Sequence, residues 1–214
     1  MIYLVSDLHG DKTARGLQEY LNIAKDDDLL IILGDICLQF EAMEENREFT
    51  EYFLSLKKNI AFIDGNHENF QYLHTFPKES WCGGEVRRLS KYIVYLQRGN
   101  VYTLNDKTFF TFGGCKSSDK WKRQGLWQPE EAATEEQYRL ALENLKKHRG
   151  VVDYILTHKY EGNAQHPRLD KYLFDLVEYI EREVSYKKWY FGHTHVEKTV
   201  DEKHVCIYHN LWTL

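Results

Sequence analysis

The stretch MIYLVSDLHG, residues 1–10, joins a short apolar run directly to a polar turn. Residues 2–6 are mostly apolar and β-favouring, and Asp7, His9 and Gly10 follow at once. Such a run is typical of a strand buried on both faces of a parallel sheet. Because open α/β sheets carry their chemistry at the carboxyl ends of their strands, Asp7 and His9 are candidate ligands of a divalent metal. A single Asp-x-His also arises by chance, so this interpretation depends on the rest of the chain.

The pattern recurs at a second predicted strand. Asp11 can cap a helix whose apolar side chains form one stripe. Residues 29–33, LLIIL, follow as a buried strand that ends in Gly34-Asp35. The order strand, helix, strand indicates a βαβ unit, so we expect the two strands to be parallel. Asp35 is then expected near Asp7 if the strands are neighbours.

A third strand ends in the same way. A charged helix over residues 44–57 leads to a strand at 60–63, which runs directly into DGNHE, residues 64–68. Gly, Asn and Asp favour turns for backbone reasons alone, so one such ending carries little information. Three endings in succession point to a shared site at one edge of a sheet.

Two later strands end in histidines. The predicted strand 151–156 ends in Thr157-His158, and the short strand 189–191 ends in GHTH, residues 192–195. Turn preference does not explain why imidazoles gather at successive strand ends. The remaining histidines are interpreted as ordinary core or surface residues: His74, His148, His166, His204 and His209.

The rest of the chain completes one α/β domain, expected to span residues 1–214. Asn105-Asp106 predicts a hairpin between strands 101–104 and 107–112. The other expected elements are a strand at 92–96, a polar loop over 115–129, helices at 134–148 and 170–183, and antiparallel strands at 197–201 and 205–209. The chain contains no internal repeat, low-complexity tract or linker.

Composition excludes several classes of protein. The net charge of −5 argues against duplex DNA as a partner, because DNA-binding proteins carry a basic face. Cys37, Cys82, Cys115 and Cys206 show no CxxC spacing and are expected to be buried free thiols in a reducing compartment. No leader and no apolar run of about 20 residues is present, so we expect a cytoplasmic protein without a membrane segment.

The residue types at the strand ends narrow the choice of metal. Carboxylate, imidazole and amide oxygen, without thiolate, suit Mn, Fe or Zn rather than Ca or a structural zinc. Seven protein ligands are too many for one catalytic ion that keeps an open position, and suit two ions that share a carboxylate. The side chains at the strand ends are these seven, Asp7, His9, Asp35, Asn66, His158, His193 and His195, together with His67.

Taken in order, the motifs Asp-x-His, Gly-Asp, Gly-Asn-His-Glu, a strand-end His and Gly-His-x-His resemble the calcineurin-like metallophosphoesterase family. The resemblance covers residues 7–195, nearly the whole chain. It implies a four-layer α/β/β/α sandwich with mixed sheets and a dinuclear metal centre. The expected ions are two divalent metals, Mn²⁺ first, with Fe and Zn as alternatives.

The resemblance also implies a role for each residue. Asp35 would bridge the two metals, and the other ligands would divide into Asp7, His9 and His195 for the first metal and Asn66, His158 and His193 for the second. Asn66 and His67 would also contact the substrate phosphate. His67 would not be a ligand: it would protonate the leaving oxygen, with Asp7 or Glu68 as an orienting partner.

The chain departs from the family pattern at two places. After Asp35 it continues Ile36-Cys37-Leu38, so the Val-Asp-Arg-Gly type of segment of the protein phosphatases, with its phosphate-gripping arginine, is absent. After His158 it has Lys159 where the family often has Pro-Pro, so the resemblance does not define the shape of the substrate cleft.

The loop after Gly113-Gly114 could supply a substitute cation. We expect Lys120 or Arg123 to contact the substrate phosphate, although a solvated loop charge explains both residues equally well. Trp81, Trp121 and Trp127 are candidates for stacking on a base or an aryl group, with packing as the alternative.

The sequence therefore predicts a metal-dependent phosphohydrolase that activates water for attack on a phosphomonoester or phosphodiester. A small nucleotide or general phosphodiester is the favoured substrate. A phosphoprotein, as for Ser/Thr protein phosphatases, is the alternative. A nuclease acting on short single strands and a non-catalytic binding scaffold on this fold are further readings. The oligomeric state is not predicted.

Overall fold

The computed structural model describes residues 1–40, 44–117, 127–160 and 170–214. Within these ranges the strands form a seven-stranded and a six-stranded sheet, both mixed. The first sheet has the order β13 (Trp212–Thr213), β1 (Ile2–Val5), β2 (Leu29–Leu33), β3 (Asn59–Ile63), β6 (Ile93–Leu96), β5 (Gly84–Arg88), β4 (Lys78–Trp81). The second has the order β11 (Lys198–Thr199), β12 (His204–Cys206), β10 (Lys188–Phe191), β9 (Tyr154–Thr157), β8 (Lys107–Phe112), β7 (Asn100–Leu104).

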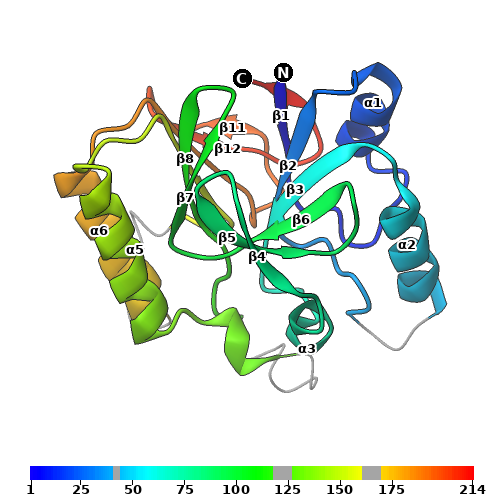
Figure 1. Cartoon of the computed structure of the whole chain (residues 1–214), viewed down its shortest axis with the longest axis horizontal. Helices are drawn as coiled ribbons and strands as arrows, with labels where there is room; N and C mark the ends of the chain where they lie inside the picture. Colours follow the sequence, from blue (N-terminus) through cyan, green and yellow to red (C-terminus); the bar gives the residue numbers. More distant parts are fainter. Residues whose placement is uncertain (41–43, 118–126, 161–169) are drawn as a thin grey trace.

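Helices cover the outer faces of the two sheets. In Figure 1, α1 (Arg15–Ile23) and α2 (Glu44–Ser55) lie on the side of β1 to β3, and α5 (Glu135–Lys147) and α6 (Lys171–Glu183) lie on the opposite side of the molecule. One buried cluster includes Leu17 of α1 and Phe53 of α2, and another includes Leu145 of α5 and Ile180 of α6. A third joins the inner faces of the sheets, where Ile31 and Phe109 are fully buried. The predicted α/β class with mixed sheets is confirmed.

The strand directions explain why the predicted strand ends converge. The strands β1, β2, β3 and β6 run parallel to one another in the first sheet. In the second sheet β8, β9, β10 and β12 are likewise parallel. The β1–β2 pairing confirms the predicted βαβ unit and places the residues after both strands at one edge of the sheet.

Of two hairpin turns in the structure, the sequence predicted one and missed the other. Asn105 and Asp106 have φ of 49° and 59° between β7 and β8, as the predicted hairpin requires. The β4–β5 hairpin was not predicted: Cys82 and Gly83 form its turn with φ of 50° and 96°. Cys82 is exposed there, which corrects the expectation that all four cysteines are buried. A cysteine is an unusual residue at a position with positive φ, so the turn has no local signature.

The described residues also form two smaller elements, α3 (Phe70–His74) and the 3-10 turn η1 (Pro129–Glu131). Among the described residues, no helix is both long enough and apolar enough to cross a membrane.

A buried ion pair between Arg98 and Asp64 connects segments at the edge of the sheet where the strands end. Arg98 lies between β6 and β7, where the chain passes from one sheet to the other, and its Nε donates to Asp64 Oδ2 at 2.8 Å. The same guanidinium donates to the carbonyls of Glu130 and Ala132, just before α5. The segment after β3 is thereby held against the segment that precedes α5.

Candidate metal centre

The residues that follow β1, β2 and β10 leave their strands with an unusual backbone conformation. Asp7 has a φ of 57° and Asp35 of 53°, and the backbone N–H of Asp7 donates to the carbonyl of Gly34. Non-glycine residues with positive φ are uncommon, and they cluster at functional sites. The other site residues with positive φ are His9 (46°), His193 (70°) and His195 (55°). Each strand end therefore turns sharply, and the turn directs its polar side chain into the site.

Two glycines of the motifs are required by the close approach of the carboxylates. A Cβ on Gly65 would overlap with Asp35 Oδ1, and a Cβ on Gly192 would overlap with Asp7 Oδ2. The glycines of Gly-Asn-His-Glu and Gly-His-x-His thus make room for Asp35, which follows β2, and for Asp7, which follows β1.

One group of side chains consists of Asp7, His9, Asp35 and His195, whose candidate ligand atoms all lie within 4.8 Å of one another. The Nε2 atoms of His9 and His195 are 2.9 Å apart. Asp7 Oδ1 lies 3.4 Å from His195 Nε2. This oxygen is buried and, within the described part of the chain, has no hydrogen-bond partner. A buried carboxylate oxygen without a donor is costly unless a cation satisfies it, so this group fits a metal ion.

A second group surrounds His158. His158 Nε2 lies 3.1 Å from Asn66 Oδ1 and 3.2 Å from His193 Nδ1. The other ring nitrogen, Nδ1, lies 2.8 Å from the carbonyl of Leu33. A carbonyl oxygen only accepts, so Nδ1 carries a proton, and Nε2 is the nitrogen that would offer its lone pair to a metal once the ring is neutral.

Asp35 lies between the two groups. Its Oδ2 is 3.5 Å from His9 Nε2 and 3.5 Å from His158 Nε2. Its Oδ1 accepts a hydrogen bond of 2.8 Å from the backbone N–H of His67. Burial raises the pKa of Asp35, but the neighbouring imidazoles, His158 first, outweigh burial and hold the pKa well below its usual range. Asp35 is therefore an ionised carboxylate in contact with both groups.

Burial sets the charge of most of the imidazoles. It lowers the pKa of His193 to about 3, and it lowers the pKa of His9 below the usual range. Burial also acts on His158, but there Asp35 outweighs it and raises the pKa to about 10. Neutral imidazoles are the form that binds metals, so His9 and His193 are ready as ligands.

His67 lies beside the first group and is half-buried. Its ring contacts His9 with centroids 5.5 Å apart, and Phe40 packs edge-on against it at 5.3 Å. Burial lowers the pKa of His67. His67 therefore lies next to the candidate ligands and not among them.

Glu68 holds the backbone of the loops. The sequence suggested it only as an orienting partner for His67. Its buried carboxylate accepts hydrogen bonds from the backbone N–H groups of Ile36, Cys37 and Gly65. Burial raises the pKa of Glu68 to about 8. The residue joins the turn after β2 to the turn after β3, which carry Asp35 and Asn66.

Sequence reasoning missed a chain of contacts behind Asn66. Asn66 Nδ2 donates to Ser117 Oγ at 3.1 Å, and the backbone N–H of Ser117 donates to Glu131 Oε2 at 3.0 Å. Both partners are buried. No motif and no neighbouring residue in the sequence indicates that Ser117 and Glu131 lie behind the site.

One histidine that we expected to be ordinary supports the first group. His209 Nε2 lies 2.9 Å from the backbone carbonyl of Asp7. Its ring stacks on Tyr208, which in turn stacks on His195 with centroids 4.9 Å apart. His209 thus supports both ends of the first group and is not an isolated surface residue.

The predicted phosphate-binding cations Lys120 and Arg123 lie outside the described residues, as does Trp121. Trp81 packs against the cluster between the sheets, with its ring 6.2 Å from that of Tyr102. For Trp81 this contact favours packing, the alternative to stacking on substrate. Trp127 is partly buried.

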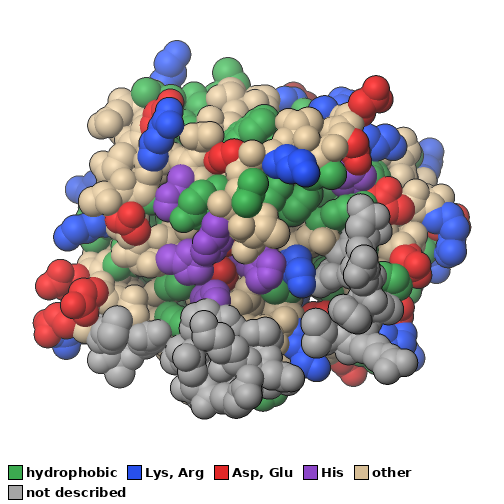
Figure 2. Space-filling model, turned by 180° about the vertical axis from the view of Figure 1, so that it is seen from behind, with side chains coloured by type: hydrophobic (Ala, Val, Ile, Leu, Met, Phe, Trp, Pro, Cys, Tyr) green, Lys and Arg blue, Asp and Glu red, His purple; other side chains and the backbone are tan. Residues whose placement is uncertain are grey.

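The site opens on one face of the molecule. The side chains of His9 and His195 are 32% and 45% exposed. Figure 2 shows histidine side chains gathered in one area of this face.

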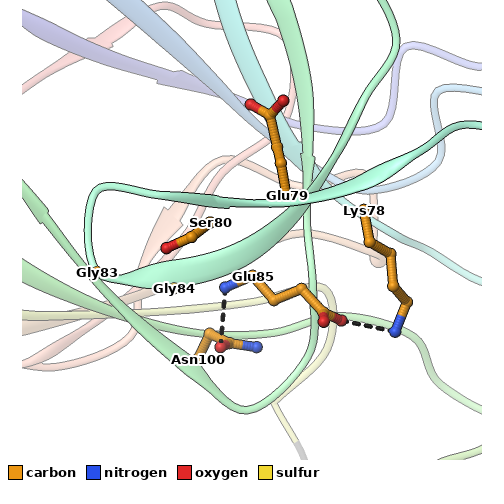
Figure 3. A pocket seen from close by; sticks show the side chains of 7 residues that line it. All are labelled: Lys78, Glu79, Ser80, Gly83, Gly84, Glu85 and Asn100. Atoms are coloured by element: carbon orange, nitrogen blue, oxygen red, sulfur yellow. Dashed lines mark hydrogen bonds and ion pairs between the residues drawn. The ribbon is translucent and has the colours of Figure 1, made fainter.

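A separate hollow of about 420 Å³ lies on the β4–β5 hairpin and is not part of this site. Among its lining residues, Lys78 and Glu85 form an ion pair, and Asn100 Oδ1 accepts a hydrogen bond from the Glu85 N–H (Figure 3). Its lining residues are Lys78, Glu79, Ser80, Gly83, Gly84, Glu85 and Asn100. None of these side chains was predicted as a site residue.

The sequence model of the calcineurin-like phosphoesterase family matches residues 1–197, which include all the strand-end residues described above. No curated protein matches the chain.

Proposed function

Because the chain belongs to the calcineurin-like phosphoesterase family, it is a phosphoric ester hydrolase of a metal-using class, and we propose that its centre is dinuclear and shares Asp35. One observation carries this proposal: a single Asp35 oxygen lies 3.5 Å from an imidazole nitrogen of each group. A carboxylate that contacts two sets of ligands is what a pair of divalent ions about 3.5–4 Å apart requires.

The two groups supply the ligands of the two sites. The first site takes Asp7, His9 and His195, and the second takes Asn66, His158 and His193. The first assignment is supported by Asp7 Oδ1, a buried oxygen that has no hydrogen-bond partner among the described residues. The converging atoms Asn66 Oδ1, His158 Nε2 and His193 Nδ1 support the second. The expected ions are Mn²⁺, Fe or Zn.

The protein's own residues then have distinct tasks. When bound, two divalent ions supply the Lewis acidity that activates water and neutralises the phosphoryl charge. Asp35 fixes the spacing of the two sites, and Glu68 holds the loops that carry Asp35 and Asn66. Asn66 contacts the phosphate from the second site.

His67 is the proposed general acid. Its backbone is tied to Asp35 Oδ1, and its ring lies against Phe40 at the exposed side of the first group. A leaving alkoxide requires a proton, and a histidine outside the ligand set can donate it from Nδ1 or Nε2. Burial lowers the pKa of His67, so the protonated ring gives up its proton readily. At neutral pH only a minority of the molecules then carries the protonated ring.

The favoured substrate is a small nucleotide or another phosphodiester. The net charge of −5 disfavours duplex nucleic acid. A phosphoprotein is the alternative substrate. A non-catalytic scaffold is disfavoured, because a scaffold has no use for His67 beside a complete set of ligands.

The test compares para-nitrophenyl phosphate with its bis ester. The protein is stripped with a chelator and assayed before and after Mn²⁺ is added, alongside His67→Ala and the control His74→Ala, whose ring belongs to neither group. We expect activity only with metal. We expect a loss of about 10²-fold or more in kcat for His67→Ala on an alkyl phosphate ester, whose leaving alkoxide requires a proton, and a smaller loss on the nitrophenyl esters. We expect no comparable loss for His74→Ala on either kind of ester.

The ester preference separates a monoesterase from a diesterase. If metal-loaded protein with two bound ions turned over neither ester, nor any member of a nucleotide and phosphopeptide panel, the hydrolase proposal would fail in favour of a scaffold.

A further inference from the structure

Cys115 is placed beside the second group by the topology of the second sheet. The strands β8 and β9 are parallel, with Phe112 opposite Thr157, so the residues after these strands emerge side by side. Gly114, with a φ of 73°, turns the chain inward, and its N–H donates to the carbonyl of Asp64. Cys115 is consequently fully buried.

The sulfur faces the ligand atoms of the second group. Cys115 Sγ lies 3.3 Å from Asn66 Oδ1 and 3.6 Å from His193 Nδ1. His193 Nδ1 is the same nitrogen that lies 3.2 Å from His158 Nε2. Cys115, His158 and His193 each offer one ligand atom within 4.8 Å of the others.

These separations match the spacing of ligands around one ion. With metal–nitrogen bonds of about 2.0–2.1 Å and metal–sulfur bonds of about 2.3 Å, neighbouring ligand atoms lie about 3.0–3.6 Å apart. The contacts among Asn66, His158, His193 and Cys115 span 3.1 to 3.6 Å. All four atoms can therefore surround one common point.

We propose that Cys115 Sγ is a ligand of the second metal site, next to Asn66, His158, His193 and the shared Asp35. The inference rests on the proposed dinuclear centre and adds a soft donor that the sequence did not reveal. Thiolate favours Zn²⁺ over Mn²⁺, whereas oxygen donors suit Mn²⁺. The two sites of this chain are then unequal, and the second one prefers zinc.

Cys37 provides the contrast. Its sulfur lies 3.6 Å from His9 Nδ1, but the nitrogen of His9 that faces the first group is Nε2. Cys37 is thus behind the ring of a ligand, whereas Cys115 is on the ligand side of His193. Both residues are buried cysteines next to a site histidine, so Cys37→Ser is a matched control for Cys115→Ser.

The test is a titration of the chelator-stripped full chain with Co²⁺ without oxygen, followed by absorption spectroscopy. A thiolate ligand produces a sulfur-to-cobalt charge-transfer band in the near ultraviolet, in addition to the weaker visible bands. We expect this band to grow with one of two bound equivalents, to vanish in Cys115→Ser, and to persist in Cys37→Ser and Cys82→Ser. In competition experiments, we expect the preference of one site for Zn²⁺ over Mn²⁺ to fall about tenfold or more in Cys115→Ser.

X-ray absorption of the native zinc-loaded protein keeps the proposal testable if Cys115→Ser does not fold. A sulfur scatterer at about 2.3 Å is expected. Two bound ions without a sulfur scatterer, or a charge-transfer band that disappears in Cys37→Ser, would overturn the role of Cys115 and leave the dinuclear centre intact. Failure of the native protein to bind two ions would instead overturn the dinuclear centre itself, and this inference with it.

Discussion

The orientation of the Asn66 amide depends on a single hydroxyl group. An amide can present either its oxygen or its NH₂ group to a site, and only the oxygen binds a cation. Here Nδ2 donates to Ser117 Oγ, so Oδ1 faces His158 and Cys115. Glu131 holds Ser117 through the Ser117 backbone N–H.

We predict that Ser117→Ala weakens binding of the second metal ion about 10- to 100-fold, because the amide loses the partner that fixes its orientation. Isothermal titration of the stripped protein with Mn²⁺ and Zn²⁺ measures the effect. Ser80→Ala, an exposed serine on β4, is the control and is expected to have native affinity. Unchanged affinity in Ser117→Ala would show that the amide is oriented without the hydroxyl.

At the level of elements, one carboxylate joins the starts of three neighbouring strands. Asp153, just before β9, accepts hydrogen bonds of 2.8 and 3.0 Å from the N–H and hydroxyl of Thr108 in β8. Its other oxygen lies 2.7 Å from Lys187 Nζ, just before β10. The hydrogen bonds from Lys187 and Thr108 lower the pKa of Asp153.

We predict that Asp153→Asn lowers the free energy of unfolding at pH 7 by about 1–2 kcal/mol, since charged hydrogen bonds are lost. The folded-state pKa lies below the unfolded value of about 3.9, so the stabilisation is complete above about pH 4 and disappears as the pH falls through the folded pKa. Urea denaturation at several pH values measures the difference, with the exposed turn variant Asp106→Asn as control. A difference that stays constant down to pH 2 would contradict the linkage.

The sequence was most informative about the strands that carry the site. Apolar runs that end abruptly in Asp or His predicted β1, β2, β3, β9 and β10, because burial on both faces leaves a clear signal in the chain. The β4–β5 hairpin and the two-residue strand β13 were missed. Apolar and polar residues alternate only weakly in these strands, and the pairing of β13 depends on a strand far along the chain.

For the whole molecule, the site lies where two sheets meet, and metal binding should stabilise both. The first sheet contributes Asp7, Asp35 and Asn66, and the second contributes His158 and His193. Buried carboxylates within 4.8 Å of each other, such as Asp7 and Asp35, repel in the absence of a cation.

We predict that removal of metal by a chelator lowers the melting temperature by about 10–20 °C relative to protein with Mn²⁺ at about 100 times its Kd, since an ion that binds only the folded state adds about 2.7 kcal/mol at each of the two sites. Scanning calorimetry measures the shift. In Asp35→Asn the increase on adding Mn²⁺ should largely disappear. An equal increase in this variant would mean that the stabilising ion binds elsewhere.

The sequence by itself determined the α/β class, the order of the motifs and the strand end at which each predicted ligand stands. It could do so because a buried strand and its terminal turn are encoded by consecutive residues. The tertiary structure alone decided which nitrogen each histidine presents, and that Cys115, Ser117, Glu131 and His209 lie next to the ligands. Cys115 and His193 are 78 positions apart, and no local pattern links them. Their contact arises from the parallel pairing of strands in one sheet and the turn at Gly114, which only the packed molecule reveals.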